Sequence, residues 1–443
     1  MEINNKFIEY LNDKAKDFLF LLKPIAQNDR KSASSQTKSK FSSHHIPSIN
    51  IDSNDILDSS ISRIDLEGNV VSKSFDYNDK LIGFEQHDFL ELRKFLEKIS
   101  IRNEFHDKIS YEFLLNSIFK WFKCNYTGKI DNKIFYDYLR KKINESVKKT
   151  RISIPIENLS IESKFKIGDI EFDFFSEDFF KKWEENSKNS KYVKDLKKKY
   201  QGKVIASISI EAEQIKCLEI AKEKVENSLI LLRIFSPTIL FDDRIPSYFG
   251  RKGSILVPES HSFIFHNEFP TLSSSIDCNN IPIRTISNDE LHMLKQNGLE
   301  EASQLMTKND PTDFEKKILN SLNILSRSVI SNNFEEKMLF TLVSIETLLL
   351  KNHNEPIQSN IGRRLAYLIS KDPTKRKEIN DLIIKAYDLR SRFIHHGQQI
   401  VETEILHKTR IYVFESIIKI LRLKDKIQTH QKLFEQLEKL TWS

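Results

Sequence analysis

The chain has 443 residues, and its 69 lysines and arginines exceed its 63 aspartates and glutamates, which gives a formal net charge of +6. This length predicts two or three domains of about 150 residues each, with cores large enough to fold without disulfide bonds. The near balance of charges excludes a uniformly basic, histone-like chain but is compatible with a polyanionic partner.

The start of the chain and its cysteines bear on location and metal content. The first residues do not form a secretory signal and no apolar run reaches membrane length, so we predict a soluble cytoplasmic protein without a membrane partner. Cys124, Cys217 and Cys278 are far apart and form no CxxC pair, which favours a reducing compartment and speaks against a zinc site. We predict no metal site and no cofactor.

The first part of the chain is predicted to be mostly helical. Apolar periodicity within residues 1–25 predicts one helix, and the serine- and lysine-rich residues 26–50 are typical of a flexible linker. Residues 51–150 read as a mostly helical region that is dense in aromatic residues, with irregular or strand-like segments up to residue 82. These aromatic residues are more often core than stacking platforms for bases.

Residues 151–310 are predicted to form an α+β domain, a candidate sensor or regulatory unit. The segments 151–156, 165–174 and 204–210 alternate with a period of two, as half-buried strands do. Residues 213–234 have the apolar spacing of an amphipathic helix.

A short basic run stands where the composition changes. Lys148, Lys149 and Arg151 are candidates for contact with a phosphate backbone. The alternative interpretation is a solvated surface, which is what most charge runs form.

The pattern from residue 311 to the end is helical throughout. Asn332 or Asn333, followed by Glu335 or Glu336, predicts a capping box before an apolar segment.

Glu346 falls on the apolar stripe of the helix that follows this predicted cap. A carboxylate in that position is costly unless it is paired, and Arg390 and Arg364 are its candidate partners.

The next predicted helix carries the most informative residues of the chain. Asp372 and Pro373 form a typical helix start, and Gly397 a typical helix end. Arg390 falls on the apolar stripe of this helix and therefore points toward protein. Arg392 continues the polar face, where Asp388 is four residues away and an exposed pair contributes about 0.3–0.5 kcal/mol.

Two histidines, His395 and His396, occupy the last turn of this helix, where the helix dipole favours a protonated imidazole. Arg390 and His395 are roughly 140° apart around a straight helix. One helix alone does not bring them to one point, whereas a bend or a second copy across a two-fold axis does.

Three segments of this region share a pattern with a known family. They are Ser344-Ile-Glu346-Thr-Leu-Leu, Arg363-Arg364-Leu-Ala-Tyr-Leu and Tyr387-Asp-Leu-Arg-Ser-Arg-Phe-Ile-His-His-Gly. Residues 311–443 thus resemble a HEPN domain of the Apea-like group, a helical bundle whose signature is an arginine, often a following polar residue, and a nearby histidine. Arg390, Ser391 and His395 fit this signature, and His396 also falls within its spacing.

The resemblance implies a metal-independent endoribonuclease that works as a homodimer, each copy contributing its arginine and histidine to a composite site. Arg390 would hold the scissile phosphate of RNA, and His395 or His396 would move protons as the 2′-hydroxyl attacks, leaving a 2′,3′-cyclic phosphate. Glu346 and Arg364 would support this site.

We therefore predict a mixed fold, with an all-α HEPN bundle at 311–443 preceded by an α+β region and an aromatic-rich helical region. The predicted function is a regulated RNA-cleaving effector in antiviral defence, with a phage-derived trigger or an antitoxin protein as candidate partner. The alternatives are a non-catalytic HEPN dimerisation or binding module, and a toxin that works with an antitoxin or nucleotidyltransferase.

Overall fold

The computed structural model describes most of the chain in two compact units. The first unit comprises Met1–Ile152 and Ser209–Ala221, and the second comprises Ser153–Ile208 and Lys222–Ser443. The described residues are 4–25, 60–64, 70–129, 134–177, 180–181, 190–239, 249–251, 259–266, 269–276, 283–331, 333–352, 354–397 and 402–442. The linker predicted at 26–50 therefore lies outside the described residues.

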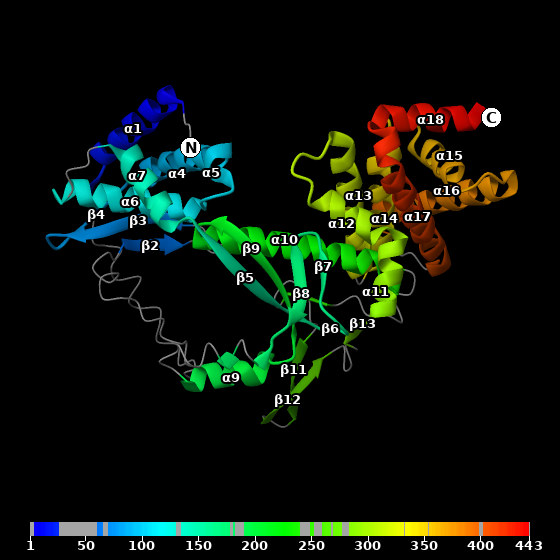
Figure 1. The fold of residues 1–443 in the computed structure, drawn as a ribbon, viewed down its shortest axis with the longest axis horizontal. Coiled ribbons are helices and arrows are strands. Elements are labelled where there is room, and N and C mark those ends of the chain that lie inside the picture. Colours follow the sequence, from blue (N-terminus) through cyan, green and yellow to red (C-terminus); the bar gives the residue numbers. More distant parts are fainter. Residues whose placement is uncertain are drawn as a thin grey trace. The chain divides into compact units, whose positions relative to one another are not determined.

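Most of the described chain is helical, and the described strands form antiparallel sheets apart from the parallel pair of β6 and β13 (Figure 1). Within the described residues, each helix is too short or too polar to cross a membrane.

The first unit combines helices with a four-stranded antiparallel sheet of order β1-β4-β3-β2. Its strands are β1 (Lys23–Pro24), β2 (Ser60–Ile64), β3 (Val70–Tyr77) and β4 (Lys80–Gly83). Its helices are α1 (Asn5–Phe20), α4 (Gln86–Ser100), α5 (Asn103–His106), α6 (Tyr111–Tyr126) and α7 (Phe135–Ser146). The helix and strand content predicted for residues 1–25 and 51–150 is confirmed where these residues are described.

The aromatic residues of the first unit are largely its core. Phe84, for example, packs its ring against Phe119 and Phe122 at centroid distances of 5.7 and 5.6 Å. Burial of such side chains contributes most of the hydrophobic stabilisation of a small unit. The interpretation as core, in place of a base-stacking surface, is confirmed for Phe119 and Phe122.

The second unit contains most of a curled antiparallel sheet of order β10-β5-β9-β8-β7, whose strands β5 and β9 each have one end in the first unit. Its strands are β5 (Lys148–Glu157), β7 (Phe165–Ile167), β8 (Ile170–Phe174), β9 (Val204–Ala212) and β10 (Gly250–Arg251). Strands therefore form at 151–156 and 204–210 as predicted, whereas 165–174 is a hairpin of two strands, β7 and β8. Two strand pairs stand outside this sheet: β6 (Leu159–Ile161) with β13 (Arg284–Ile286), and β11 (Glu259–His266) with β12 (Phe269–Ile276).

The helices that follow the sheet strands are mostly those that periodicity predicts. They are α9 (Ser190–Tyr200), α10 (Gln214–Phe235), the short turn η2 (Pro237–Ile239), α11 (Asn288–Leu294), the π-turn η3 (Lys295–Leu299) and α12 (Glu300–Met306). The segment after residue 288 reads as one helix in the sequence. It is interrupted at Gly298, whose φ of 115° is a conformation that only glycine adopts readily.

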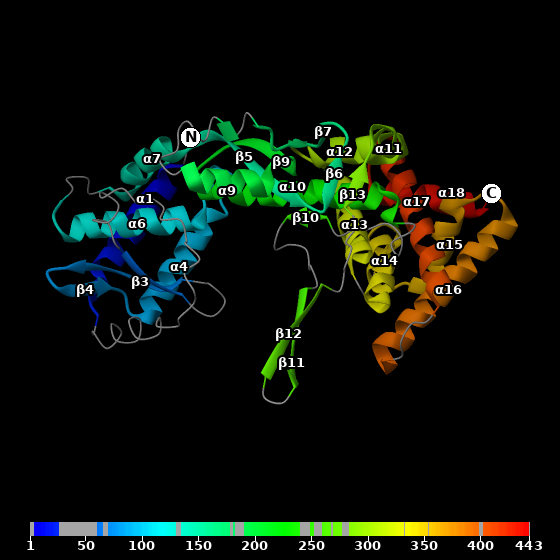
Figure 2. The same cartoon turned by 90° about the horizontal axis from the view of Figure 1, so that it is seen from below.

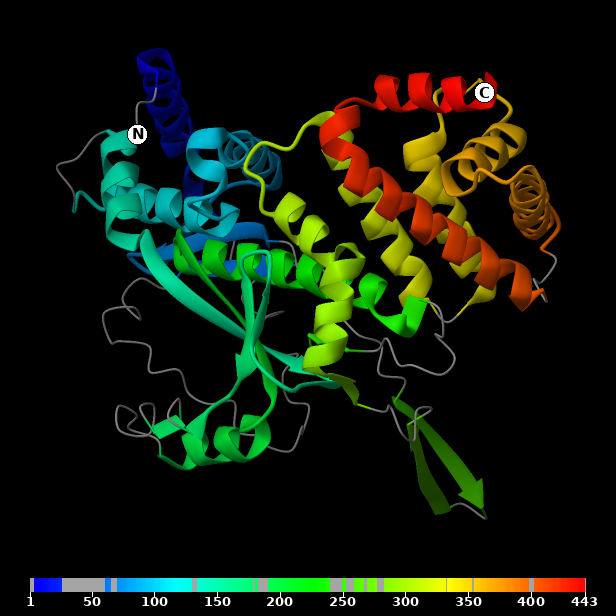
Figure 3. The ribbon, with the colours of Figure 1, turned by 45° about the vertical axis from the view of Figure 1, so that its right-hand side comes forward.

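The remainder of the second unit is a helical bundle. Its helices are α13 (Asp313–Ile330), α14 (Phe334–Leu349), α15 (Ile357–Ile369), α16 (Pro373–His396), α17 (Thr403–Ile427) and α18 (His430–Trp442). Helix α14 packs against α13, α15, α16 and α17, and α15 and α16 form a helical hairpin (Figure 2). Helix α17 runs along the bundle and ends where α18 begins (Figure 3).

The capping prediction for α14 is half right. Asn333 caps the helix, since its side chain accepts hydrogen bonds from the backbone N–H groups of Glu335 and Glu336. The Glu336 carboxylate accepts the hydroxyl of Ser331 and so does not close the box. A reciprocal capping box is present instead at α13, between Thr312 and Glu315.

Candidate functional site

Helix α16 has the ends that its sequence predicts. The Asp372 side chain accepts the backbone N–H of Thr374, and Pro373 takes the first helical position. Gly397 ends the helix with a φ of 64°, and its N–H donates to the Phe393 carbonyl at 2.8 Å. These local signals set the two ends of α16 and so the face of the helix on which each residue between them lies.

Arg390 is directed toward the bundle, as its position on the apolar stripe predicts. Its Nη1 lies 3.5 Å from Oε1 of Glu346 on α14, and the two side chains are 26% and 16% exposed. The Nε atom of Arg390 is buried and has no hydrogen-bond partner among the described residues. The guanidinium is therefore held by one long contact, and its buried Nε donor is unsatisfied.

Tyr387 is a third member of this cluster that the sequence pattern did not single out. Its hydroxyl donates to Oε1 of Glu346 at 2.9 Å. Burial and the adjacent Glu346 carboxylate raise the pKa of Tyr387, so the hydroxyl remains a donor at neutral pH. The sequence signal that could have identified Tyr387 is its position one turn before Arg390 on the same apolar stripe.

Arg364, the other predicted partner of Glu346, pairs elsewhere. Its two Nη atoms donate to the two carboxylate oxygens of Glu355 at 2.7 Å each, and Nη1 also donates to the Leu349 carbonyl at 2.7 Å. Its guanidinium also lies 4.7 Å from the ring centroid of Phe434. The prediction that Arg364 could pair with Glu346 is wrong, because the loop before α15 brings a closer carboxylate.

The remaining residues of the predicted signature lie on the surface. Ser391, Arg392, His395 and His396 are all exposed, and the two imidazole rings are 6.4 Å apart. Among the described residues, no ion pair joins Arg392 to Asp388, whose carboxylate accepts a hydrogen bond from Gln358 at 3.4 Å. Exposed imidazoles in a last helical turn are accessible to a ligand or to a second protein.

The basic run predicted to contact nucleic acid belongs to the first unit. Lys148, Lys149 and Arg151 are exposed on β5. The cluster around Arg390 belongs to the second unit.

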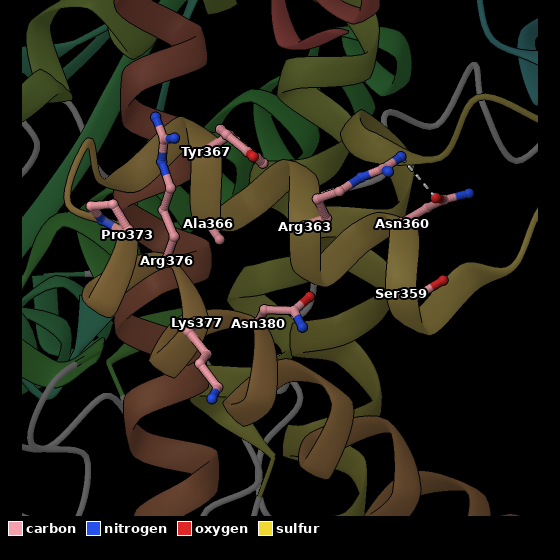
Figure 4. Close-up of a pocket in the computed structure, with 9 residues that line it drawn as sticks. All are labelled: Ser359, Asn360, Arg363, Ala366, Tyr367, Pro373, Arg376, Lys377 and Asn380. Carbon is pink, nitrogen blue, oxygen red and sulfur yellow. Dashed lines mark hydrogen bonds between the residues drawn. The ribbon is translucent and has the colours of Figure 1, made fainter. Parts of the chain in front are cut away.

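A surface pocket between α15 and α16 is a second feature that the sequence did not reveal. It encloses about 600 Å³ and is lined by Ser359, Asn360, Arg363, Ala366, Tyr367, Pro373, Arg376, Lys377 and Asn380 (Figure 4). No three His, Cys, Asp or Glu side chains of the described residues are grouped so that they could hold a metal ion.

Comparisons with protein-family models, with curated proteins and with solved structures found no match to this chain.

Proposed function

We propose that this protein is a metal-independent endoribonuclease of the HEPN type and a regulated effector of antiviral defence. The observation that carries the proposal is the contrast between two arginines of one bundle. Arg364 has a bidentate carboxylate partner and a carbonyl, each at 2.7 Å, whereas Arg390 has a single contact at 3.5 Å. A partly exposed guanidinium with an unused donor is suited to bind a phosphate through two hydrogen bonds.

The proposed reaction needs only groups that the chain supplies. The 2′-oxygen of RNA forms a bond to phosphorus as the bond from phosphorus to the 5′-oxygen breaks. One histidine accepts the 2′-proton, and a second donates a proton to the leaving 5′-oxygen. Arg390 neutralises the charge that develops on the phosphate oxygens. The products are a 2′,3′-cyclic phosphate and a 5′-hydroxyl.

Two copies of the chain are part of the proposal. Arg390 points toward Glu346 on α14, whereas His395 and His396 are exposed at the helix end. A two-fold dimer would bring the arginines and histidines of both copies to one composite site, because the same surface of each copy meets its counterpart in such a dimer.

The test is RNA cleavage in EDTA with analysis of the product ends. The wild-type protein, given RNA with and without lysate from phage-infected cells, is expected to leave 2′,3′-cyclic phosphates. His395→Ala and His396→Ala, each made alone, identify the catalytic histidine by the larger loss of rate, about 100-fold or more. Products with 3′-hydroxyl ends would contradict the proposed chemistry.

A second candidate function rests on the same contact. The Arg390–Glu346 pair is also what a purely structural ion pair looks like, and a bundle so stabilised serves as a dimerisation or binding module. This candidate predicts that Arg390→Ala lowers stability and leaves the phenotype unchanged in a folded dimer, whereas the nuclease loses its phenotype.

A further inference from the structure

The pocket between α15 and α16 (residues as given above) is strongly basic. Arg363, Arg376 and Lys377 line it, and none of the described residues that line it is acidic. Arg363 and Lys377 are exposed, and neither forms an ion pair with any described residue. Unpaired cations around one hollow raise the local concentration of anions.

The polar groups of the pocket are held in place by the two helices. The Arg376 guanidinium stacks on Tyr367, 4.0 Å from its ring centroid, and its Nε donates to the Ser370 carbonyl at 2.8 Å. The Arg363 side chain donates to Oδ1 of Asn360 at 3.2 Å (Figure 4). Such preorganised donors lose little entropy when a ligand arrives.

Gly362 allows the two helices to approach closely at the base of the pocket. A Cβ atom at this position would lie 2.6 Å from Oδ1 of Asn380 and 3.3 Å from the Asn380 carbonyl oxygen. The Asn380 amide therefore lies against the backbone of α15 and adds a neutral hydrogen-bonding group to the cations.

Lys377 of the pocket and the exposed His395 lie on the same side of α16. Lys377 and His395 are eighteen residues apart, which is about five full turns of an α-helix, so their side chains leave the helix in the same direction. The distance along the axis is about 27 Å, the length of about eight nucleotides in a stacked strand at roughly 3.4 Å each. A strand that follows this side of α16 connects the two places.

We propose that this pocket binds the phosphate backbone of single-stranded RNA, as a substrate-holding subsite remote from Arg390. The inference rests on the proposed function for the identity of the strand. We expect the strand to cross the pocket and to continue along α16. The cations and the amide groups of Asn360 and Asn380 would contact it in the pocket, and the exposed side of α16 leaves room for it beyond.

The test is equilibrium binding of a fluorescent 2′-O-methyl oligonucleotide, which has no 2′-hydroxyl and is not cleaved. The charge-reversed double variant Arg363→Glu/Lys377→Glu is expected to bind about tenfold more weakly or worse. The plot of log affinity against log salt should lose a slope of about 1.4, because two phosphate contacts on a single strand are removed.

Two further variants make the result specific. Lys432→Glu/Lys439→Glu makes the same change of charge at exposed residues of α18 outside the pocket, and it is expected to change affinity less than twofold. Arg363→Gln/Lys377→Gln removes the charges without reversing them and should show an intermediate loss. Equal affinities of the pocket variant and the Lys432/Lys439 control would overturn the proposal.

The same assay separates this proposal from the nuclease. Arg390→Ala is expected to bind the oligonucleotide and to remain sensitive to the pocket substitutions. Pocket-dependent binding by a protein that cleaves no RNA would sustain the subsite and reject the nuclease. If the pocket variant cleaves RNA at the full rate and binds with full affinity, the nuclease is sustained and the subsite is rejected. Binding of fluorescent ATP that depends on Arg363 and Lys377, with no binding of the oligonucleotide, would reject the strand and assign the pocket to a mononucleotide.

Discussion

At the residue scale, two arginines with different surroundings have different roles. Arg364 and Glu355 are 11% and 10% exposed and are joined by parallel hydrogen bonds, and Arg364 lowers the pKa of Glu355. Arg390 and Glu346 are more exposed, and their contact is longer. The first pair is a structural element, whereas the second holds a cation loosely at the surface.

This contrast predicts unequal losses of stability. Arg364→Ala leaves the Glu355 carboxylate buried without its partner and should lower the free energy of unfolding by about 3–5 kcal/mol. Arg390→Ala should cost about 1 kcal/mol or less, as expected for a partly exposed pair. Urea denaturation followed by circular dichroism compares the two, and equal losses would contradict the assigned roles.

The Tyr387 hydroxyl provides a second test at this scale. Tyr387→Phe removes the 2.9 Å hydrogen bond to Glu346 and is expected to lower the free energy of unfolding by about 1 kcal/mol. Tyr367→Phe is the matched control, because its ring stacks under Arg376 and only the hydroxyl is removed. If thermal melting does not distinguish the two variants, the hydrogen bond has no energetic role.

At the scale of elements, the C-terminal end of α14 is a meeting point of the bundle. The last carbonyls of a helix lack partners within it. Here Arg364 of α15 donates to the Leu349 carbonyl, and Nε2 of His430 on α18 donates to the Leu348 carbonyl at 2.7 Å. His430 also packs on Phe434 with ring centroids 4.7 Å apart.

His430 makes the docking of α18 sensitive to acid. Burial lowers the pKa of His430 in the folded protein below that of the unfolded chain, and the nearby Lys317 and Arg364 add to this effect. The unfolded state therefore binds more protons, so stability should fall as the pH drops below about 6.5. His430→Gln keeps a hydrogen-bond donor but does not titrate. Its denaturation midpoint should therefore fall less than that of the wild type when the pH is lowered from 7.5 to 5. The same loss in both proteins would exclude His430 as the cause.

The ends of α16 and the orientation of Arg390 could be predicted because their signals are local. Asp372, Pro373 and Gly397 mark helix ends by their own backbone chemistry, and the apolar stripe fixes which way Arg390 points. The partner of Arg364 could not be predicted, since Glu355 reaches it from a loop. The parallel pairing of β6 with β13 and the pocket likewise depend on segments that come together only in the folded chain.

At the scale of the whole molecule, the proposed chemistry lies in the second unit and requires two copies of it. His395 and His396, the exposed half of the signature, are not brought to Arg390 by any described part of one chain. The first unit, with its aromatic core and the basic run on β5, is available to regulate the proposed ribonuclease.

A composite site predicts how mixtures of active and inactive chains behave. When Arg390→Ala is allowed to exchange subunits with an equal amount of wild-type protein, about half of the dimers are heterodimers, whose shared site lacks one Arg390 and should be inactive. Only wild-type homodimers, about one quarter of the dimers, remain active, so activity should fall to about one quarter of that of the same total amount of wild-type protein. A fall to one half, measured after confirmed exchange, would mean that each copy works alone.

The nuclease proposal is tested most simply by the rate of RNA cleavage by Arg390→Ala in EDTA, beside wild type and Lys432→Ala, a control at an exposed residue of α18. We predict that wild type and Lys432→Ala cleave alike and that Arg390→Ala loses about 100-fold or more, since one charge-stabilising donor is removed from the transition state. Cleavage by Arg390→Ala at the wild-type rate would contradict the account.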